Sequence, residues 1–336
     1  MMTVSLCVVA YNEEQHLPRL LHDLKKQTYP HEMIQIVLID GNSTDRTKQI
    51  MQQFAQKEST FCDVQVLDNP QRVQAAGWNI AIAAATGDVI IRIDAHTHIP
   101  AEFTAKNMAL QESGEYVTGG IRPCLIDAPT PWKKTLLAVE NSMFGSSISK
   151  GRKNTNSGYV KSMFHAAYRR EVFEKAGTFN PQLLRTEDNE MHYRIREAGY
   201  KLYCDPQIIS YQYARSNFRK MVKQKYENGY WIGLTLGVCP GCISLFHLVP
   251  MFFVLGIAFT TVLAFCSYWQ FALIMWAAYL AFVLMGTVCT ILNGEGNRWT
   301  FLMPVLFLAV HISYGIGTLA GIIKMPWLRN KLRGSQ

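Results

Sequence analysis

From Ile243 onward the chain carries almost no charge, and this feature constrains its fold more than any other. The only charged side chains after that point are Glu295, Arg298, Lys324, Arg329, Lys331 and Arg333. This part of the chain contains three uncharged apolar runs, at residues 245–265, 271–292 and 301–323. Each run is close to the ~20 residues with which an α-helix crosses a ~30 Å hydrocarbon core. We therefore predict a membrane region at residues 243–323 with about three hydrophobic helices, followed by a basic tail at 324–336.

The side of the membrane on which this tail lies stays open. Three crossings would place Lys324 and Arg329 opposite the part of the chain before Ile243, against the tendency of basic residues to remain in the cytoplasm. Pro250, or the glycines at 315–321, are alternative signs that one segment is re-entrant or lies in the interface.

The remaining residues are only mildly basic, because 28 Lys and Arg and 24 Asp and Glu precede Ile243. This balance is too weak to favour nucleic acid as a partner. Eight cysteines are scattered along the chain, and Cys239 and Cys242 have C-x-x-C spacing without a second pair. We interpret Cys239 and Cys242 as part of a turn before the first membrane helix. The first apolar run is interrupted at Asn12, unlike a signal peptide, so we expect the part before Ile243 to remain in the cytoplasm.

Residues 4–120 alternate short β-rich runs with helical patterns. Strands are predicted at 4–10, 34–39, 64–67, 89–93 and 116–119, and helices at 14–27, 44–56 and 73–85. Such alternation is typical of an α/β fold, with a mostly parallel sheet flanked by helices. Further helices are predicted at 132–144 and at 187–197, and the stretch 150–158 is predicted to be a loop.

Carboxylates follow two of the apolar runs directly. Asp40 ends the run 36–39 and is followed by a turn that contains Asp45, while Asp94 ends the run 89–93. Ligands of open α/β sheets bind at the carboxyl ends of the strands, where Asp40 can accept a hydrogen bond from a base imide. An acid of the first helical turn is the alternative for Asp45. The run Ala10-Tyr11-Asn12-Glu13 after the first strand can hold a nucleobase and ribose, or simply begin a helix.

The segment Asp94-Ala95-His96-Thr97-His98 suggests a metal site. Alternate residues of an extended segment point the same way, so Asp94, His96 and His98 would converge on one divalent ion, Mg²⁺ or Mn²⁺. A strand-end turn with solvent-facing histidines is the alternative. Such an ion would neutralise a leaving diphosphate.

A further pair of acids, Glu187 and Asp188, opens a predicted helix. A carboxylate fixed at a helix start can take a proton from an acceptor hydroxyl. Capping of the helix by Thr186 is the competing interpretation, and the two are compatible.

Taken together, the ordered motifs Ala-Tyr-Asn-Glu-Glu, Asp-Gly-Asn-Ser-Thr-Asp, Gly77-Trp78-Asn79, Asp94-Ala95-His96 and Glu187-Asp188 resemble those of glycosyltransferase family 2. The resemblance covers residues 3–235 and implies the GT-A fold, with an interfacial helix at about 215–236, and inversion at the anomeric centre. The Asp-Ala-His variant and the apolar helices that follow are similar to bacterial exopolysaccharide glucosyltransferases of the succinoglycan type.

The resemblance also implies individual roles. Asp188 would be the catalytic base with Glu187 beside it, and the metal would lie at Asp94, His96 and His98, although His96 replaces the usual second Asp. The donor pocket would be lined by Ala10, Tyr11, Asn12, Glu13, Asp40, Asp45, Arg72, Gln74, Asn79, Asp94 and Ala95. His165, Lys223, Gln224 and Trp231 would face the acceptor or the membrane.

The resulting hypothesis is an inverting, membrane-bound transferase that moves a hexose, glucose from UDP-glucose by resemblance, to a polyprenyl-diphosphate-linked saccharide. It would act at the bacterial plasma membrane with its catalytic part in the cytoplasm, in contact with lipids and with a polysaccharide-assembly complex as a further candidate partner. The spacing after Gln224 lacks the Gln-x-x-Arg-Trp signature of processive members. The alternatives are a polyprenyl-phosphate sugar transferase and an inactive, membrane-anchored nucleotide-binding subunit.

Overall fold

The computed structural model describes residues 1–142, 145, 156–213 and 217–333, and the side chains up to residue 326. The chain divides into two compact units. The first, which we call the sheet unit, comprises residues 1–125 and 150–213, and the second, the helical unit, comprises 126–149 and 214–336. The predicted loop at 150–158 lies largely outside the described residues.

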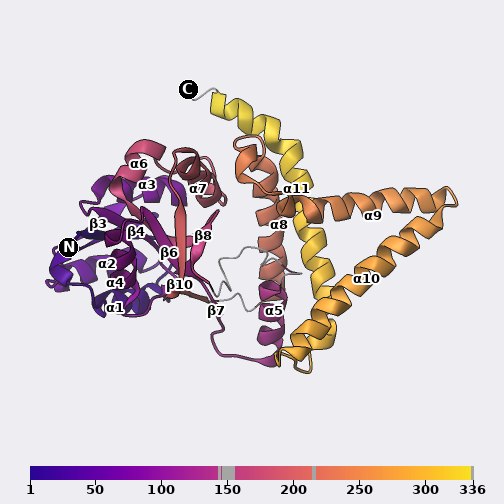
Figure 1. The fold of residues 1–336 in the computed structure, drawn as a ribbon, viewed down its shortest axis with the longest axis horizontal. Helices are drawn as coiled ribbons and strands as arrows, with labels where there is room; N and C mark the ends of the chain where they lie inside the picture. The colour runs from indigo at the N-terminus through magenta and orange to yellow at the C-terminus, as the bar shows by residue number, and fades with distance from the viewer. Residues whose placement is uncertain (143–144, 146–155, 214–216, 334–336) are drawn as a thin grey trace. The chain divides into compact units, whose positions relative to one another are not determined.

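The sheet unit is built on one large sheet with strand order β3-β2-β1-β4-β9-β6-β10-β8 (Figure 1). Its strands are β1 Val4–Ala10, β2 Ile34–Asp40, β3 Asp63–Asp68, β4 Val89–Asp94, β6 Val117–Ile121, β8 Gly158–Val160, β9 Phe164–Arg169 and β10 Leu202–Ile209. Strands β1 to β4 are parallel, whereas β9 runs antiparallel between β4 and β6. A small second sheet joins β5 Thr97–His98, β11 Tyr211–Tyr213 and β7 Cys124–Leu125.

Helices cover both faces of the large sheet. They are α1 Leu17–Lys25, α2 Thr47–Lys57, α3 Gln74–Ala84, α4 Phe103–Glu112, α6 Arg170–Ala176 and α7 Glu187–Glu197, with the short 3-10 helix η1 at His31–Met33. Alternate side chains of a strand point to opposite faces, so neighbours in β1 enter different cores. Leu6 packs with α1, α2 and α4, while Cys7 packs with Trp78 of α3 and with α6 and α7.

This architecture confirms the predicted α/β class with a mostly parallel sheet, and the five strands predicted before residue 120 are all present. The first helix begins at Leu17 rather than at residue 14, because residues 11–16 form the turn that leaves β1. The antiparallel strand β9 and helices α4 and α6 were not predicted. Their residues lack a clean period of two or 3.6, since β9 is buried on both sides.

The helical unit contains only helices and turns in its described part. They are α5 Pro131–Asn141, α8 Phe218–Thr235, η2 Pro240–Cys242, η3 Leu245–Leu248, α9 Val249–Phe265, α10 Trp269–Leu292, η4 Thr300–Leu302 and α11 Met303–Arg333. Three helices are long and apolar enough to cross a membrane, at Leu245–Phe265, Trp269–Leu292 and Thr300–Pro326. The helix α11 continues without a break into the predicted tail. Cys239 precedes the short 3-10 turn η2 and Cys242 ends it, so the two cysteines belong to a turn before α9, as predicted.

Helix α8, which the sequence assigned to the catalytic domain, groups with the apolar helices instead. Glycines on α8 and α11 bring the two backbones into direct contact. A Cβ atom on Gly233 would lie 2.3 Å from the carbonyl oxygen of Thr318, and one on Gly317 would lie 2.1 Å from that of Tyr226. Only glycine tolerates such an approach, so these positions fix how α8 lies along α11.

Replacing Gly321 by alanine tests this contact. The new Cβ would lie 2.1 Å from the carbonyl oxygen of Tyr230, so the helices must separate. We expect Gly321→Ala to lower the free energy of unfolding by about 1–3 kcal/mol, as overpacking does in other cores. The measurement is the thermal unfolding midpoint of the detergent-solubilised protein.

Gly256→Ala in α9 is the matched control, because its Cβ would meet nothing closer than the Met275 sulfur at 3.6 Å. Equal midpoints for the two variants would show that α8 and α11 are not in backbone contact.

Candidate active site

The loops after β1 and β2 are joined by hydrogen bonds at the carboxyl edge of the sheet. The side-chain oxygen of Asn12 accepts from the backbone nitrogen of Thr44 at 2.8 Å. The backbone nitrogen of Asn12 donates to the Ser43 hydroxyl at 3.0 Å. The backbone nitrogen of Glu13 donates to the Thr47 hydroxyl at 2.8 Å. The register pairs Ala10 with Asp40, so both loops start from the same level.

Several residues that were predicted to line the sugar-donor pocket stabilise these two loops. Asp45 accepts from the backbone nitrogens of Thr47 at 2.9 Å and of Glu14 at 3.2 Å, which is the helix-start role that the sequence offered as the alternative. Asp40 is buried and accepts from the backbone nitrogen of Ser43 at 3.1 Å. Tyr11 and Asn12 are exposed at the rim and remain available to a ligand. The two loops therefore form a rigid wall beside the strand ends.

Asp94, at the end of β4, is surrounded by cations and donors. Its carboxylate lies 3.8 Å from a nitrogen of Arg92, 4.0 Å from Arg122 and 3.2 Å from Nε2 of His165. Gln74 donates to it at 3.3 Å, and Ala95 follows it in the chain and is buried. Burial alone would raise the pKa of Asp94, but the His165 hydrogen bond and the Arg92 charge hold that pKa well below its usual range. Asp94 is therefore an anion in the folded protein.

Within the sheet unit His165 contacts Asp94 and Ser210, and its predicted role toward an acceptor stays a prediction. It is buried, its Nε2 faces Asp94, and its Nδ1 lies 2.7 Å from the Ser210 hydroxyl. Burial lowers the pKa of His165, so the neutral ring donates from Nε2 to Asp94 and accepts from Ser210 at Nδ1. The side chain holds Asp94 in place.

The predicted convergence of Asp94, His96 and His98 on one ion is wrong for His98. A turn at residues 95–96 separates β4 from β5 and breaks the alternation on which the prediction rested. His98 turns away to Asp23, with Nδ1 2.7 Å from the Asp23 carboxylate, and its ring stacks on Tyr211. The described residues contain no group of three or more His, Cys, Asp and Glu side chains placed for a metal.

His96 stays close to the loop after β1. Its Nδ1 lies 3.2 Å from the Glu13 carboxylate and its Nε2 lies 3.0 Å from the amide nitrogen of Gln212 on β11. With Nδ1 donating to Glu13, the lone pair of Nε2 accepts from the Gln212 amide nitrogen, which a metal ion bound to Nε2 would have to displace. That Asp94 and His96 hold a divalent cation stays a prediction, in which waters and phosphates would supply the other ligands.

Glu187 and Asp188 begin α7, and Arg92 connects them to the Asp94 cluster. Arg92 lies 3.5 Å from Glu187 and packs on the Trp78 ring. Burial, followed by the neighbouring Asp188 charge, raises the pKa of Glu187 to about 7, and burial likewise raises the pKa of Asp188. One oxygen of Glu187 is buried and has no hydrogen-bond partner among the described residues. The Thr186 side chain makes no capping hydrogen bond to α7, although Thr186 stands at the N-cap.

Asn79 is bonded within the fold, and its predicted contact with the donor stays a prediction. Its amide nitrogen donates to the carbonyl of Phe179 at 2.8 Å and its oxygen accepts from the Phe179 nitrogen at 2.8 Å. Arg72 and Gln74 are exposed, and Arg72 reaches the Asn42 amide oxygen at 3.2 Å. Arg72 and Gln74 can therefore contact a ligand, whereas Asn79 positions the loop before α7.

Lys223, Gln224 and Trp231 all lie on α8 in the helical unit. Lys223 is exposed and lies 3.8 Å from Glu227, while Gln224 and Trp231 are half-buried. Their role toward an acceptor stays a prediction.

The sequence interpretation missed three residues of this cluster: Arg92, Arg122 and Gln212. Arg92 had a visible signal, because a charged residue interrupts the otherwise apolar run of β4. Arg122 and Gln212 lie in short segments that carry no motif, and only the pairing of β11 with β5 and β7 brings Gln212 to His96.

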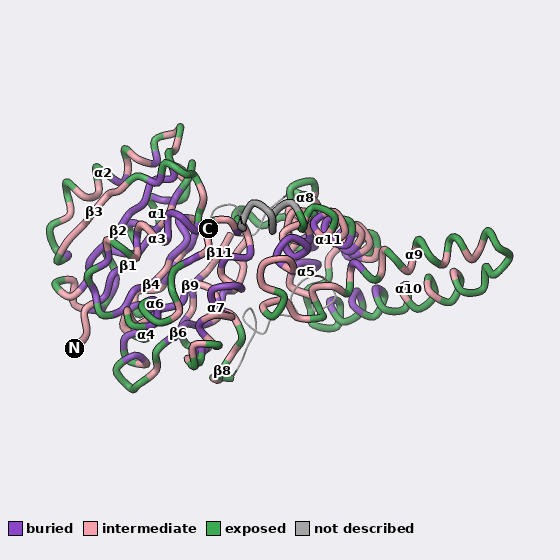
Figure 2. The backbone as a smooth tube through the Cα atoms, turned by 90° about the horizontal axis from the view of Figure 1, so that it is seen from above, coloured by how far each residue is buried: buried purple, intermediate pink, exposed green. Residues whose placement is uncertain are grey.

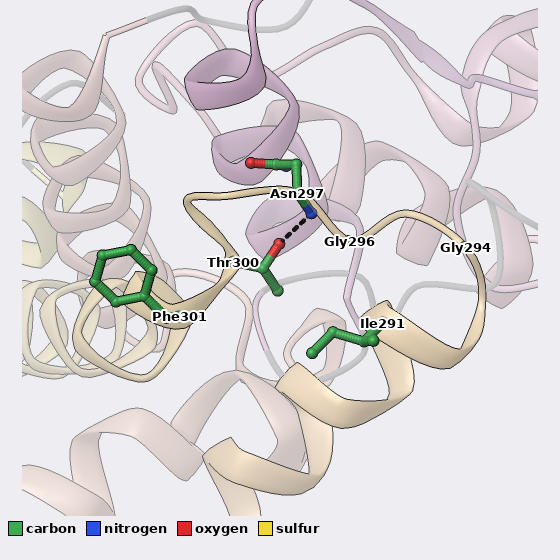
Figure 3. Close-up of a pocket in the computed structure, with 6 residues that line it drawn as sticks. All are labelled: Ile291, Gly294, Gly296, Asn297, Thr300 and Phe301. Carbon is green, nitrogen blue, oxygen red and sulfur yellow. Dashed lines mark hydrogen bonds between the residues drawn. The ribbon is translucent and has the colours of Figure 1, made fainter.

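A separate pocket of about 450 Å³ lies in the helical unit, in the connection from α10 to α11 (Figure 3). It is lined by Ile291, Gly294, Gly296, Asn297, Thr300 and Phe301. The backbone nitrogen of Asn297 donates to the Thr300 hydroxyl at 2.8 Å, which shapes the loop. No lining residue titrates near neutral pH, so this pocket offers no acid–base chemistry.

Comparison with known proteins decides the family. The model of Glycosyl transferase family 2 matches residues 5–177, which is just over half of the chain. The chain belongs to glycosyl transferase family 2. It is therefore a glycosyltransferase, and the resemblance drawn from its motifs is confirmed.

Two relatives align over nearly the whole chain. A Methanococcus voltae protein named dolichyl N-acetyl-alpha-D-glucosaminyl phosphate 3-beta-D-2,3-diacetamido-2,3-dideoxy-beta-D-glucuronosyltransferase is 23% identical over 342 residues, covering 96% of this chain and 97% of the relative. The succinoglycan biosynthesis protein ExoA of Rhizobium meliloti (strain 1021) is 28% identical, covering 94% of each.

Among solved structures, the mannosyltransferase PcManGT from Pyrobaculum calidifontis, in complex with GDP-Man and Mn²⁺, is similar with a TM-score of 0.61. Its sequence identity is 16%, and the match covers 95% of this chain and 87% of that one. This likeness, together with the family match, shows the GT-A-like fold.

Asn79→Ala tests whether Asn79 is structural. Both hydrogen bonds to Phe179 are lost, so we expect the free energy of unfolding to fall by about 1–3 kcal/mol. Nucleotide affinity, measured by calorimetry where the variant is folded, should be unchanged. The exposed Gln53→Ala on α2 serves as control. Weakened nucleotide binding with unchanged stability would restore Asn79 to the donor site.

Proposed function

We propose that this glycosyltransferase moves a hexose from a nucleoside diphosphate sugar to a lipid-linked saccharide at a membrane surface, with inversion at the anomeric carbon. UDP-glucose is the donor that we propose, and a polyprenyl-diphosphate-linked sugar is the acceptor. The whole-length similarity to a dolichyl phosphate glycan transferase and to a succinoglycan biosynthesis protein supports this acceptor class.

One observation carries the proposal: the single guanidinium of Arg92 lies beside both Asp94 and Glu187. Its nitrogen lies 3.8 Å from Asp94, at the strand end where a nucleotide would bind, and 3.5 Å from Glu187, next to Asp188. A donor diphosphate near Asp94 and an acceptor hydroxyl near Asp188 would thereby be neighbours.

The residues suggest how the transfer proceeds. The acceptor oxygen attacks the anomeric carbon while the bond from that carbon to the diphosphate oxygen breaks, and the nucleoside diphosphate leaves. Asp188 takes the proton of the attacking hydroxyl, because its raised pKa makes it a better base than an ordinary aspartate. Arg92 and Arg122 place positive charge beside the site where the diphosphate charge develops.

Asp94 and His96 are the residues that would hold a divalent cation, with remaining ligands from phosphates and water. When bound, Mg²⁺ or Mn²⁺ would neutralise charge on the leaving diphosphate. The similarity to a mannosyltransferase solved with Mn²⁺ supports this proposal. Glu13 orients His96 through Nδ1, so it acts on the cation site indirectly.

We further propose that the enzyme works at the plasma membrane of a bacterium with the sheet unit in the cytoplasm, where nucleotide sugars are made. Its three apolar helices support a membrane location. A polysaccharide-assembly complex and membrane lipids are the partners that this location implies.

The direct test is nucleotide-sugar turnover by the full chain in nanodiscs with lipid-linked acceptors. We expect release of UDP from UDP-glucose to require the acceptor, and Asp188→Asn to lower kcat by about 10²–10⁴-fold while nucleotide affinity is kept. The exposed Asp68→Asn, at the end of a neighbouring strand, is the matched control and should retain full activity.

Two outcomes would point elsewhere. Turnover that survives Asp188→Asn with bare polyprenyl phosphate as acceptor would favour a polyprenyl-phosphate sugar transferase. Nucleotide binding without turnover of any donor would favour a binding subunit.

The pH dependence of kcat/KM gives a second test of the carboxylate pair. Both pKa values are raised, so the pair binds protons at pH values where an exposed carboxylate is already ionised. We expect activity to fall as the pH drops through about 7, the pKa of Glu187, and the pair to titrate as a unit. An acidic limb near pH 4 would contradict the buried environment described for this pair.

A further inference from the structure

The charges of the helical unit are divided between two groups of helices. The stretch from Val249 to Leu292, which forms α9, α10 and their connection, contains no Asp, Glu, Lys or Arg. Helices α5 and α8, in contrast, are charged. Helix α5 carries Lys133, Lys134 and Glu140, and helix α8 carries Arg219, Lys220, Lys223, Lys225 and Glu227. The question is on which side of this division α11 lies, because its composition alone would allow it to cross a bilayer.

Backbone contact ties α11 to the charged group. The contact positions advance together, since a Cβ on Gly229 would meet Tyr314 and one on Gly233 would meet Thr318. Just after α8, a Cβ on Gly237 would meet Met325. Helices α8 and α11 are therefore parallel partners over this length, and α8 must lie at the same membrane depth as α11.

Charged residues lie beside the first part of α11 and near its end. Arg219 and Lys223 border a groove of about 500 Å³ whose other walls include Val305, Leu308 and Ile312 of α11. Further along, Lys324 of α11 itself is exposed. If the first half of α11 lay in the hydrocarbon, Arg219 and Lys223 would lie there with it. If the second half lay there, Lys324 would lie there with it. Both placements are unfavourable for exposed charges.

Helices α9 and α10 have the opposite character. They form a hairpin that projects away from α8 and α11 (Figure 1), and Figure 2 shows little buried surface along it. Burial is confined to its base, where Met251 and Val283 lie near α11, while Phe265 at the tip is 87% exposed. An exposed apolar surface of this extent marks a membrane or protein contact, and the absence of charge along the hairpin favours hydrocarbon.

The hairpin also has the length of a full crossing. The 24 residues of α10 extend about 36 Å, and the 21 residues from Leu245 to Phe265 about 30 Å. Tyr268 and Trp269 stand exposed at the tip, and such aromatic residues are enriched at the membrane–water interface.

We propose that the chain crosses the bilayer only twice, through α9 and α10, and that α5, α8 and α11 form a layer in the headgroup region on the side of the sheet unit. The partner of this layer is the lipid headgroup surface: Arg219 and Lys223 meet phosphates, and the apolar walls of the groove meet the first methylenes. The C-terminal basic residues then lie on the same side as the sheet unit, which removes the conflict with the positive-inside tendency.

Native cysteines allow a test with the full chain in intact cells and in inverted membrane vesicles. Cys62 is exposed on the sheet unit and Cys266 is exposed at the hairpin tip. A membrane-impermeant maleimide is applied from each face and the labelled peptides are identified by mass spectrometry. An epitope tag after Gln336 reports the C-terminus through antibody binding from each face.

We expect Cys266 to be labelled only from the face opposite to Cys62, and the tag to be reached only from the face of Cys62. A tag on the face opposite to Cys62 would overturn the proposal, because α11 would then cross. Labelling of Cys266 from the face of Cys62 would also overturn it, because the hairpin would then be re-entrant. Gln270→Cys, also exposed near the tip, repeats the measurement if Cys266 reacts poorly. The outcome does not depend on the proposed enzymatic activity.

Discussion

The ion pairs of Arg92 are the interaction on which the candidate active site depends. A charge in the interior of a strand is costly unless it is paired, and Arg92 is paired twice, with Asp94 on its own strand and with Glu187 on α7. Its guanidinium also lies over the rings of Trp78 and Phe179. Asn79 holds Phe179 by its backbone, so α3, the segment before α7 and the end of β4 are all fixed around one side chain.

Much of the sheet unit could be predicted because its strands are short apolar runs that end in acids. Asp40 and Asp94 end β2 and β4, as the sequence predicted. The predicted start of α7 at Glu187 is also confirmed. The metal ligands could not be read from spacing, because the turn at 95–96 sends His98 to Asp23, a partner 75 residues away. His165 illustrates a related limit of sequence patterns: a motif shows that a residue matters, but not that its side chain contacts Asp94 and Ser210.

In the helical unit, apolar runs predicted the helices but not their organisation. Hydropathy measures how well a helix tolerates hydrocarbon, and α11 is apolar enough to cross, as α10 is. What distinguishes the two is the row of glycines that joins α11 to the charged helix α8, a contact between segments that lie far apart in the sequence. The grouping of α8 with the membrane helices follows from that contact, and so does our inference that only a hairpin crosses.

The central claim is that one carboxylate, Asp188, activates the acceptor for a single in-line displacement. The most direct measurement is the anomeric configuration of the product, determined by NMR of the newly formed linkage after reaction with an α-linked nucleotide sugar. A single displacement predicts a β-linkage, seen as a large coupling between the first two ring protons for a glucose product. An α-linkage would require two displacements or a different mechanism and would contradict the proposed role of Asp188 as the base.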